Sequence, residues 1–291
     1  MSDGFVVVDK AGAMTSHDVV AIARRALGTR KVGHAGTLDP MATGVLVLGF
    51  GNGTRLLQYI TDGDKSYLAT IVLGISTISD DKDGQILTQT NTSAITDAAI
   101  TTVLQTMVGT IMQRPSSVSA VKVAGERDYD RVRAGEKFEL DARSITISQL
   151  DVRDIRRHEE TIDIDIEVTC SAGTFIRAIA RDLGDALHVG GHLSALRRTR
   201  VATFSQDQAL SIAQLQSGDF QPLDLAAVAR SIFAVREISL EEVLELSYGR
   251  SLTAHGDALI HAALSPDNRL IALLRDHEGR AKPLAVFAAA N

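Results

Sequence analysis

Alternation of apolar and polar residues predicts several β-strands along the chain. The clearest case is residues 162–170 (IDIDIEVTC), where every second side chain is apolar and acidic residues stand between them. Residues 67–73 alternate in the same way. A period of two turns one side of a strand to a core and the other to solvent, so we expect Cys170 on the core side. Short apolar runs predict further strands at residues 5–8, 45–50 and 201–204.

Apolar residues spaced three and four apart predict helices between these strands. Ser16 is a suitable N-cap for a helix over residues 17–27, which Gly28 ends. Another helix is expected over residues 174–187, directly after a glycine. Further helices are expected at residues 54–60, at residues 100–108, and from the capping box of Ser239 and Glu242 to Gly249.

Two segments lack a clear pattern and suggest the domain organisation. Residues 116–140 are polar and weakly periodic, which is typical of a mobile excursion. The pattern also weakens over residues 222–233, which we interpret as a linker. Three strand-like runs follow, at residues 258–264, 270–274 and 284–288. We therefore expect a large domain followed by a small α/β or barrel module.

Composition and charge narrow the protein class. The 291 residues are 45% hydrophobic, as in a packed globular protein, and glycine and proline contents exclude collagen-like or low-complexity chains. With one cysteine and no CxxC pair we expect a reducing compartment. No signal peptide or membrane segment is expected. The net charge of -6 by itself argues against a nucleic-acid partner.

The segment GHAGTLDPMATG (residues 33–44) concentrates potentially reactive groups in a glycine-rich loop. Glycines let the backbone approach a ligand, and Asp39 precedes a proline, which favours an outward carboxylate at a turn. The simpler alternatives are that Asp39 only forms a turn and that His34 is an ordinary surface histidine. No second histidine stands at a metal-binding spacing, which argues against a metal site.

A second segment, CSAGTFIR (residues 170–177), ends a strand and begins a helix. Arg177 lies in the first helical turn, where a cation opposes the helix dipole, so a carboxylate or phosphate partner is expected. An ordinary surface ion pair is the alternative. Tyr67 begins a strand and by itself indicates only packing. Arginine clusters, including Arg197 and Arg198, suit phosphate groups but are also common on solvated faces.

Taken together, these segments resemble the bacterial TruB family of tRNA pseudouridine synthases. The resemblance covers most of the first 205 residues and is weaker in the tail. It rests on DKAGAMTSHDVV, KVGHAGTLDPMATGVLVLGFG, KSYLATIVLG, RPSSVSAVKVAGERDY, CSAGTFIRAIARDLG and GGHLSALRRTRV, in that order. The GHAGTLDPMATG block is highly specific.

The resemblance implies an α+β fold of the pseudouridine synthase type. It has a central mixed, largely antiparallel sheet flanked by helices, plus a small C-terminal α/β domain of the RNA-binding PUA-like kind. The implied domains are a catalytic domain over 1–230, with a mobile thumb at about 116–140, and an accessory domain over 231–291. The implied enzyme isomerises uridine to pseudouridine in the T-loop of tRNA, at position 55 in tRNA numbering. We expect no cofactor and no metal, a T-arm stem-loop of tRNA as partner, no membrane contact, a monomer and a cytoplasmic location.

Matching positions imply the roles of single residues. Asp39 is the catalytic carboxylate, Tyr67 stacks on the target base, and Arg177 pairs with the carboxylate. His34 holds the opened T-loop. The remaining substrate-binding residues are Phe175 and Leu196 around the uracil and the cations Lys10, Lys65, Arg197 and Arg198. Phe175 departs from the usual tyrosine, and Ala11 stands where a proline is usual.

The implied reaction breaks the N1–C1′ bond, turns the uracil and joins C5 to C1′, which needs an ionised carboxylate but no redox step. Asp39 either attacks covalently or abstracts a ribose proton, and the residues leave both open. The buried uridine has to be flipped out of its stack. An alternative function is a tRNA-binding folding chaperone with secondary or absent catalysis. A carboxylate glycoside hydrolase is disfavoured because no second acid accompanies Asp39 in its loop.

The acidic total hides a local imbalance. Residues 177–200 contain five arginines and two aspartates, whereas acids gather on residues 162–167 and on the helix expected after Ser239. We therefore expect a basic cleft on an acidic body, with salt-sensitive RNA affinity.

Overall fold

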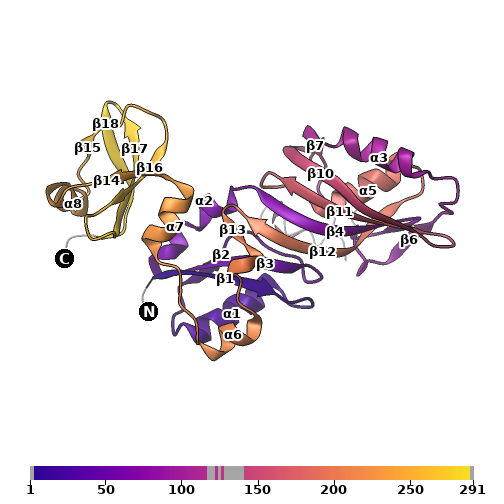
Figure 1. The fold of residues 1–291 in the computed structure, drawn as a ribbon, viewed down its shortest axis with the longest axis horizontal. Helices are drawn as coiled ribbons and strands as arrows, with labels where there is room; N and C mark the ends of the chain where they lie inside the picture. The colour runs from indigo at the N-terminus through magenta and orange to yellow at the C-terminus, as the bar shows by residue number, and fades with distance from the viewer. Residues whose placement is uncertain (1–2, 117–121, 124–125, 128–140, 289–291) are drawn as a thin grey trace.

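The computed structural model describes residues 3–116, 122–123, 126–127 and 141–288. Its largest element is a sheet of nine strands: β1 (Gly4–Lys10), β2 (Val32–His34), β3 (Thr43–Phe50), β4 (Lys65–Leu73), β7 (Gly109–Gln113), β10 (Arg143–Arg157), β11 (Ile162–Cys170), β12 (Gly191–Val201) and β13 (Phe204–Ser205). The order is β1-β3-β12-β4-β11-β10-β7, with β2 beside β3 and β13 beside β12 (Figure 1). Every pairing in it is antiparallel except β12 with β3. The implied α+β class with a mixed, largely antiparallel sheet is confirmed.

Two helices cover one face of the β4, β11 and β10 part of this sheet: α3 (Asp97–Thr106) and α5 (Ile176–Ala186). The predicted alternation of β11 is confirmed, since its isoleucines, Val168 and Cys170 are buried against this helical layer. Each fully buried isoleucine stabilises the fold by about 1.5–3 kcal/mol. On the other face the intervening acids lie in ion pairs, such as Glu167 with Arg153 and Asp165 with Arg156.

The β1 and β3 part of the sheet is covered on both faces. On one face lie α1 (Ser16–Ala26) and α6 (Ile212–Ser217). On the other face lie the 3-10 helix η1 (Gly51–Arg55), α2 (Leu57–Thr61) and α7 (Leu225–Ile232). A second short 3-10 helix, η2 (Gln206–Gln208), follows β13. Burial on both faces explains why residues 45–50 are an almost unbroken apolar run.

The two parts of the sheet meet where β12 runs parallel to β3 for only two residue pairs, Arg197 with Thr43 and Arg198 with Gly44. Gly44 has a φ of +101°, and a Cβ placed on it would lie 2.1 Å from the backbone oxygen of Arg198. Only glycine fits this crossing. The loop with the candidate aspartate leads directly into it.

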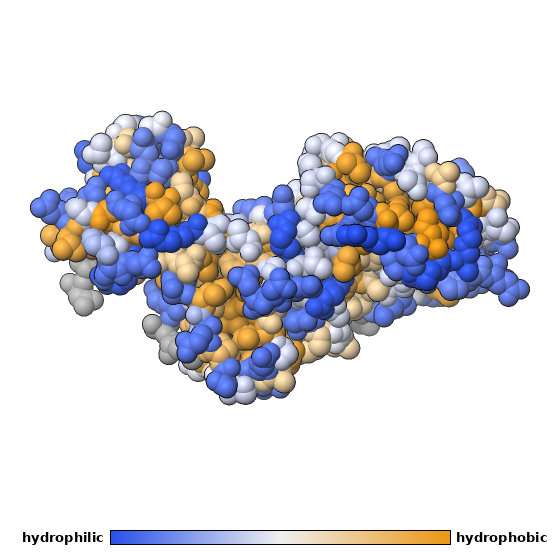
Figure 2. Space-filling view, viewed as in Figure 1, coloured by the Kyte–Doolittle hydropathy of each residue, from blue (hydrophilic) through white to orange (hydrophobic). Residues whose placement is uncertain are grey.

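The C-terminal part is a second, five-stranded sheet in the order β14-β16-β17-β18-β15, at one end of the molecule (Figure 1). Its elements are β14 (Ala234–Glu237), α8 (Leu240–Ser247), β15 (Leu252–Thr253), β16 (Ile260–Leu264), β17 (Leu270–His277) and β18 (Arg280–Val286). The predicted strands at residues 258–264 and 270–274 and the Ser239–Glu242 capping box are confirmed. The strand predicted at residues 284–288 begins four residues earlier, at Arg280. Figure 2 shows a notch between this unit and the rest of the surface, and α7 packs against β1, β16 and β17.

Four sequence predictions need correction. Residues 201–204 are not one strand, because Ala202 and Thr203 form the turn between β12 and β13. The N-cap of α1 is Thr15, whose hydroxyl accepts from the Asp18 amide, and not Ser16. The second predicted helix begins at Ile176, because residue 175 is still extended and serves as its N-cap. Residues 222–233 are not a plain linker, because an aspartate-capped helix, α7, buries its apolar face there. The domain division near residue 230 stays a prediction.

The predicted thumb falls largely outside the described residues, at 117–121, 124–125 and 128–140. Two small two-stranded sheets complete the fold: β5 (Ile75–Thr77) with β6 (Ile86–Gln89), and β8 (Lys122–Val123) with β9 (Glu126–Arg127). Among the described residues, no helix has the length and apolar content needed to cross a bilayer.

Candidate active site

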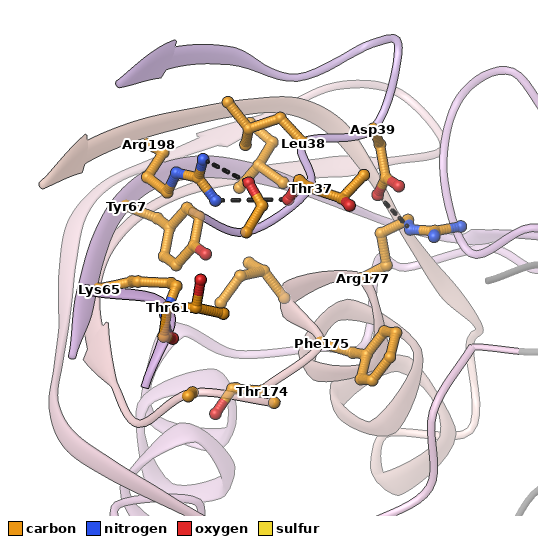
Figure 3. A pocket seen from close by; sticks show the side chains of 15 residues that line it. Thr37, Leu38, Asp39, Thr61, Lys65, Tyr67, Thr174, Phe175, Arg177 and Arg198 are labelled. Carbon is orange, nitrogen blue, oxygen red and sulfur yellow. Dashed lines mark hydrogen bonds and ion pairs between the residues drawn. The ribbon is translucent and has the colours of Figure 1, made fainter. Parts of the chain in front are cut away.

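A cavity of about 320 Å³ opens where α5 begins, beside the loop that joins β2 to β3 (Figure 3). The loop, the turn before α5 and strands β4 and β12 all contribute to it. Its lining residues are Gly36, Thr37, Leu38, Asp39, Thr61, Lys65, Tyr67, Ala172, Gly173, Thr174, Phe175, Ile176, Arg177, Leu196 and Arg198. Seven of the ten residues singled out in the sequence therefore share one cavity.

Asp39 and Arg177 form an ion pair at this cavity. The Nε atom of Arg177 lies 3.0 Å from Oδ2 of Asp39, as the dashed line in Figure 3 marks. The arginine side chain is only 6% exposed, whereas the aspartate side chain is 33% exposed. Within the described residues, Oδ1 of Asp39 has no hydrogen-bond partner. The carboxylate is thus held from one side and open on the other.

A second carboxylate, that of Asp81, also holds Arg177. Nη1 of Arg177 lies 3.2 Å from Oδ2 of Asp81 and donates to the Ser79 carbonyl at 2.8 Å. Asp81 in turn accepts from the Ser79 hydroxyl at 2.6 Å. Two carboxylates compensate for a buried cation placed in the first turn of a helix, where the dipole opposes it. The expected carboxylate partner of Arg177 is confirmed.

Sequence reasoning missed Asp81. It stands in the run DDKD (residues 80–83), which has the composition of a solvated turn. Asp80 adopts a left-handed backbone with φ of +58°, and Asp81 is buried. No local signal in this run marks Asp80 and Asp81 as its two buried acids, because their partners, Arg181 and Arg177, lie on the distant helix α5.

Tyr67 lies on β4 beneath the loop, with its ring at the cavity. Burial raises the pKa of its hydroxyl to about 12, although the neighbouring Arg198 guanidinium acts in the opposite direction. Tyr67 therefore carries its proton at neutral pH. It offers an aromatic face and a hydroxyl that donates or accepts, but not a phenolate.

Arg198 is 1% exposed and ties the candidate loop to the sheet. Its guanidinium donates to the carbonyls of Val45, Gly36 and Thr37 at 2.8, 3.1 and 3.3 Å. Lys65 is similarly buried and donates to the carbonyls of Thr61 and Gly63. Both cations are bonded to neutral carbonyls and form no ion pair among the described residues, so they leave positive charge beside the cavity. This lining suits an anionic ligand.

Three of the predicted binding residues lie outside the cavity lining. His34 lies on β2, edge-to-face with His17 at 5.7 Å between ring centroids. Burial, together with the charge of His17, lowers the pKa of His34, so that it is neutral at pH 7. Its Nδ1 atom is buried and has no hydrogen-bond partner within the described residues.

Lys10 is fully buried and is hydrogen-bonded to backbone carbonyls. Its ammonium donates to the carbonyls of Met14, Ala11 and Pro40 at 2.6, 3.0 and 3.3 Å. Burial lowers its pKa to about 8, and the charge of Asp39 acts in the opposite direction. Arg197 points away from its neighbour Arg198, as strand alternation requires, and forms a bidentate pair with Asp9 at 2.8 and 3.0 Å. Both cations thus have partners within the chain.

No group of three or more metal-ligating side chains occurs among the residues described by the structure. The cavity itself offers one carboxylate and three cations, Lys65, Arg177 and Arg198. Such a set can hold an anionic substrate and keep a carboxylate ionised beside it.

Comparison with protein-family models gives three matches along the chain. Residues 24–176 match the N-terminal domain of the TruB family pseudouridylate synthases. Residues 177–224 match the tRNA pseudouridylate synthase B C-terminal domain. Residues 233–288 match the C-terminal region of tRNA pseudouridine synthase II.

Curated relatives match the chain over nearly their whole length, and those described below have the same name. The chain is 49% identical to the tRNA pseudouridine synthase B of Arthrobacter sp. (strain FB24), covering 100% of this chain and 98% of the relative. It is 48% identical to that of Mycobacterium tuberculosis (strain ATCC 25618 / H37Rv), covering 99% and 97%. Among solved structures, a Cbf5-Nop10-Gar1 complex superposes with a TM-score of 0.72 at 23% identity, over 98% of this chain and 85% of that chain. At that identity the superposition supports the fold alone.

Proposed function

The chain belongs to the TruB family of pseudouridylate synthases and isomerises uridine to pseudouridine in tRNA, and we propose that its target is the T-loop uridine at position 55. Asp39 is the catalytic carboxylate in this proposal. The observation that carries it is the contact of Asp39 with a buried arginine at a cavity of nucleobase size.

The geometry supports an ionised Asp39. In a water-poor cavity a carboxylate tends to take up a proton, and a guanidinium at 3.0 Å opposes this. One oxygen contacts Arg177, and the other has no partner among the described residues. That free oxygen either bonds to C1′ as the N1–C1′ bond breaks or removes a ribose proton. In the first route C5 then bonds to C1′ as the bond between C1′ and Asp39 breaks. In the second route C5 bonds to C1′ as Asp39 returns the proton to the ribose. In both routes the C5 proton then leaves, N1 gains a proton and Asp39 is regenerated, so the overall change is an isomerisation.

The cavity volume supports base flipping. About 320 Å³ lies at the lower end of the range for small-molecule sites and fits one nucleoside, not a stacked loop. The uridine therefore has to leave its stack, at a cost of a few kcal/mol. Tyr67 provides a flat face for the base, while Leu196 and Phe175 line the walls. An aromatic ring is kept where the family usually has a tyrosine.

The remaining assignments are part of the same proposal. Lys65 and Arg198 contribute positive charge beside the cavity, and Lys10 acts by holding the Pro40 carbonyl next to Asp39. His34 and Arg197 lie outside the lining and would contact the T-arm around the flipped base. We propose a monomer acting in the cytoplasm, with a catalytic domain over 1–230 and an accessory domain over 231–291.

Release of tritium from an unmodified tRNA transcript containing 5-tritiated uridine tests the function. The wild-type protein should release one tritium per tRNA, and a transcript with cytidine at position 55 should release none. Asp39→Asn should abolish release while tRNA affinity stays within about threefold. Equal release from both proteins would refute the role of Asp39, and release from the cytidine transcript would refute the target position. No release by the wild-type protein would favour the folding chaperone.

A further inference from the structure

One buried hydroxyl, that of Ser16, clamps the residue before Asp39. Ser16 is the first residue of α1 and is 1% exposed. Its Oγ accepts from the Leu38 amide at 2.9 Å and donates to the Leu38 carbonyl at 3.2 Å. A single side chain thus binds both polar atoms of one backbone residue, next to the catalytic carboxylate.

One buried carboxamide, that of Gln113, makes the equivalent clamp near Arg177. Gln113 ends β7 and is 3% exposed. The Phe175 amide donates to its Oε1 at 2.8 Å, and its Nε2 donates to the Phe175 carbonyl at 3.0 Å. Phe175 is the N-cap of α5 and makes no side-chain cap of its own. The carboxamide therefore fixes the turn that starts the helix carrying Arg177.

Neither side chain forms its hydrogen bonds with residues near it in the sequence. The helix that begins at Ser16 is already capped by Thr15, whose hydroxyl and Asp18 form the complete capping box. This leaves the Ser16 hydroxyl free to reach across 22 residues to the loop. Gln113 comes from the far edge strand of the sheet and reaches across 62 residues. Most buried polar side-chain atoms have a hydrogen-bond partner, and the backbone of the site provides the partners of both these side chains.

We propose that Ser16 and Gln113 are a pair of positioning residues that set the distance between the Asp39 carboxylate and the Arg177 guanidinium. The inference rests on the proposed function of that ion pair. Ser16 fixes the backbone one residue before Asp39, and Gln113 fixes it two residues before Arg177. Neither touches the cavity, so neither contacts the substrate. A displacement of about 1 Å at a reacting group costs on the order of 100-fold in rate, so each clamp affects turnover and not binding.

Three variants and two matched controls test the proposal. Ser16→Ala removes one hydroxyl, Gln113→Met removes both hydrogen bonds at nearly constant length, and Gln113→Glu keeps the acceptor but loses the donor. The controls are Ser148→Ala and Gln149→Met on β10, whose side chains make exposed hydrogen bonds away from the site. Turnover, KM and tRNA affinity are measured below the unfolding transition of each protein.

We expect Ser16→Ala and Gln113→Met to lower kcat by about 10- to 100-fold, with KM and affinity within threefold. Gln113→Glu should lie between Gln113→Met and the wild type. Both controls should behave as wild type. An unchanged kcat in Ser16→Ala or Gln113→Met would overturn the proposal, as would a loss of affinity as large as the loss of kcat, since that indicates general disruption of the site.

A second readout needs no RNA and separates this inference from the proposed function. The rate at which the Nε–H proton of Arg177 exchanges with water, measured by NMR, reports its contact with Asp39. We expect exchange at least threefold faster in Ser16→Ala and Gln113→Met than in the wild type, and unchanged in both controls. Unchanged exchange in those two variants refutes the clamps even where the wild type is active. If exchange is faster in the two variants and the wild-type protein releases no tritium, the proposed function is refuted and the clamps remain supported.

Discussion

Asp81 meets the guanidinium of Arg177 at 3.2 Å through Nη1, so the arginine that contacts Asp39 is itself held by a second carboxylate. The substitution Asp81→Asn keeps the shape but removes the charge. We expect kcat to fall about tenfold with little change in tRNA affinity, because Arg177 is then free to shift. Asp81→Ala should also lower the free energy of unfolding by about 3 kcal/mol, because it leaves a buried cation with one carboxylate fewer. Chemical denaturation and steady-state kinetics check the two expectations, and a stable, fully active Asp81→Ala would contradict them.

Arg177→Ala should lose turnover far more than affinity. Its Nε and Nη1 donors are occupied by Asp39, Asp81 and the Ser79 carbonyl, and the side chain is buried, which leaves little for a phosphate. We expect kcat to drop at least 100-fold, while the Kd for tRNA stays within about threefold. Binding is measured by filter retention at fixed salt. Equal losses of kcat and affinity would identify Arg177 as a phosphate contact instead.

Tyr67→Phe separates the ring from the hydroxyl. The ring face that we propose as the stacking surface for the base is kept, while the hydroxyl beside Arg198 is lost. We expect unchanged tRNA affinity and slower turnover, and Tyr67→Leu should lose both. With a pKa of about 12 the hydroxyl stays protonated below about pH 11. The activity of the wild type should therefore show no rise near pH 10 attributable to a phenolate, and such a rise absent from Tyr67→Phe would contradict this protonation state.

Lys10 should make stability depend on pH in a window set by its lowered pKa. The pKa is about 8 in the folded protein and 10.5 as the ordinary value, so the unfolded chain binds one more proton between them. Stability therefore rises with pH across this window and is lost as pH falls toward 8. Relative to Lys10→Met, the wild type should gain about 2 kcal/mol in unfolding free energy between pH 8 and 9.5. Parallel curves for the two proteins in urea denaturation would rule out this titration.

Two glycines with nearly the same backbone angle should respond differently to alanine. Gly44 has φ of +101° and Gly109 has φ of +105°. A methyl group at Gly109 meets open space, whereas at Gly44 it lies 2.1 Å from the Arg198 oxygen. Gly109→Ala should cost about 1–2 kcal/mol from backbone strain alone. Gly44→Ala should cost several kcal/mol more and abolish activity by separating β12 from β3. Similar thermal unfolding of the two variants would contradict this difference.

Much of the fold follows from local patterns. The alternation of residues 162–170 and the capping box at Ser239 correctly place a strand and a helix, because burial and capping there depend on neighbouring residues. The start of α1 is misplaced by one residue because Ser16 and Thr15 are equally good caps locally. Only the distant Leu38 decides that the Ser16 hydroxyl is used elsewhere.

In the site, too, some features follow from local sequence and others depend on distant residues. Asp39, Tyr67 and Arg177 were singled out from the loops and from the family resemblance, and the structure brings them to one cavity. Burial of Lys10 depends on distant backbone such as the Pro40 carbonyl. The separation of Arg197 from Arg198 follows from strand alternation, but the sequence pattern predicts no strand over residues 191–200. The residues around Asp81 and Gln113 in the sequence give no signal of their roles, since their partners lie 96 and 62 residues away.

The position of β12 between β3 and β4 has a consequence for protein synthesis. The strands that carry the Asp39 loop and Tyr67 leave the ribosome early, but the strand that joins them is made about 120 residues after β4. Until residues 191–201 emerge, the edge of β4 that pairs with β12 has no partner, and neither has the Thr43–Gly44 end of β3, whose other end pairs with β2. Unpaired edges invite association with other chains. A nascent chain is therefore inactive toward tRNA and vulnerable to aggregation until residues 191–201 have been made.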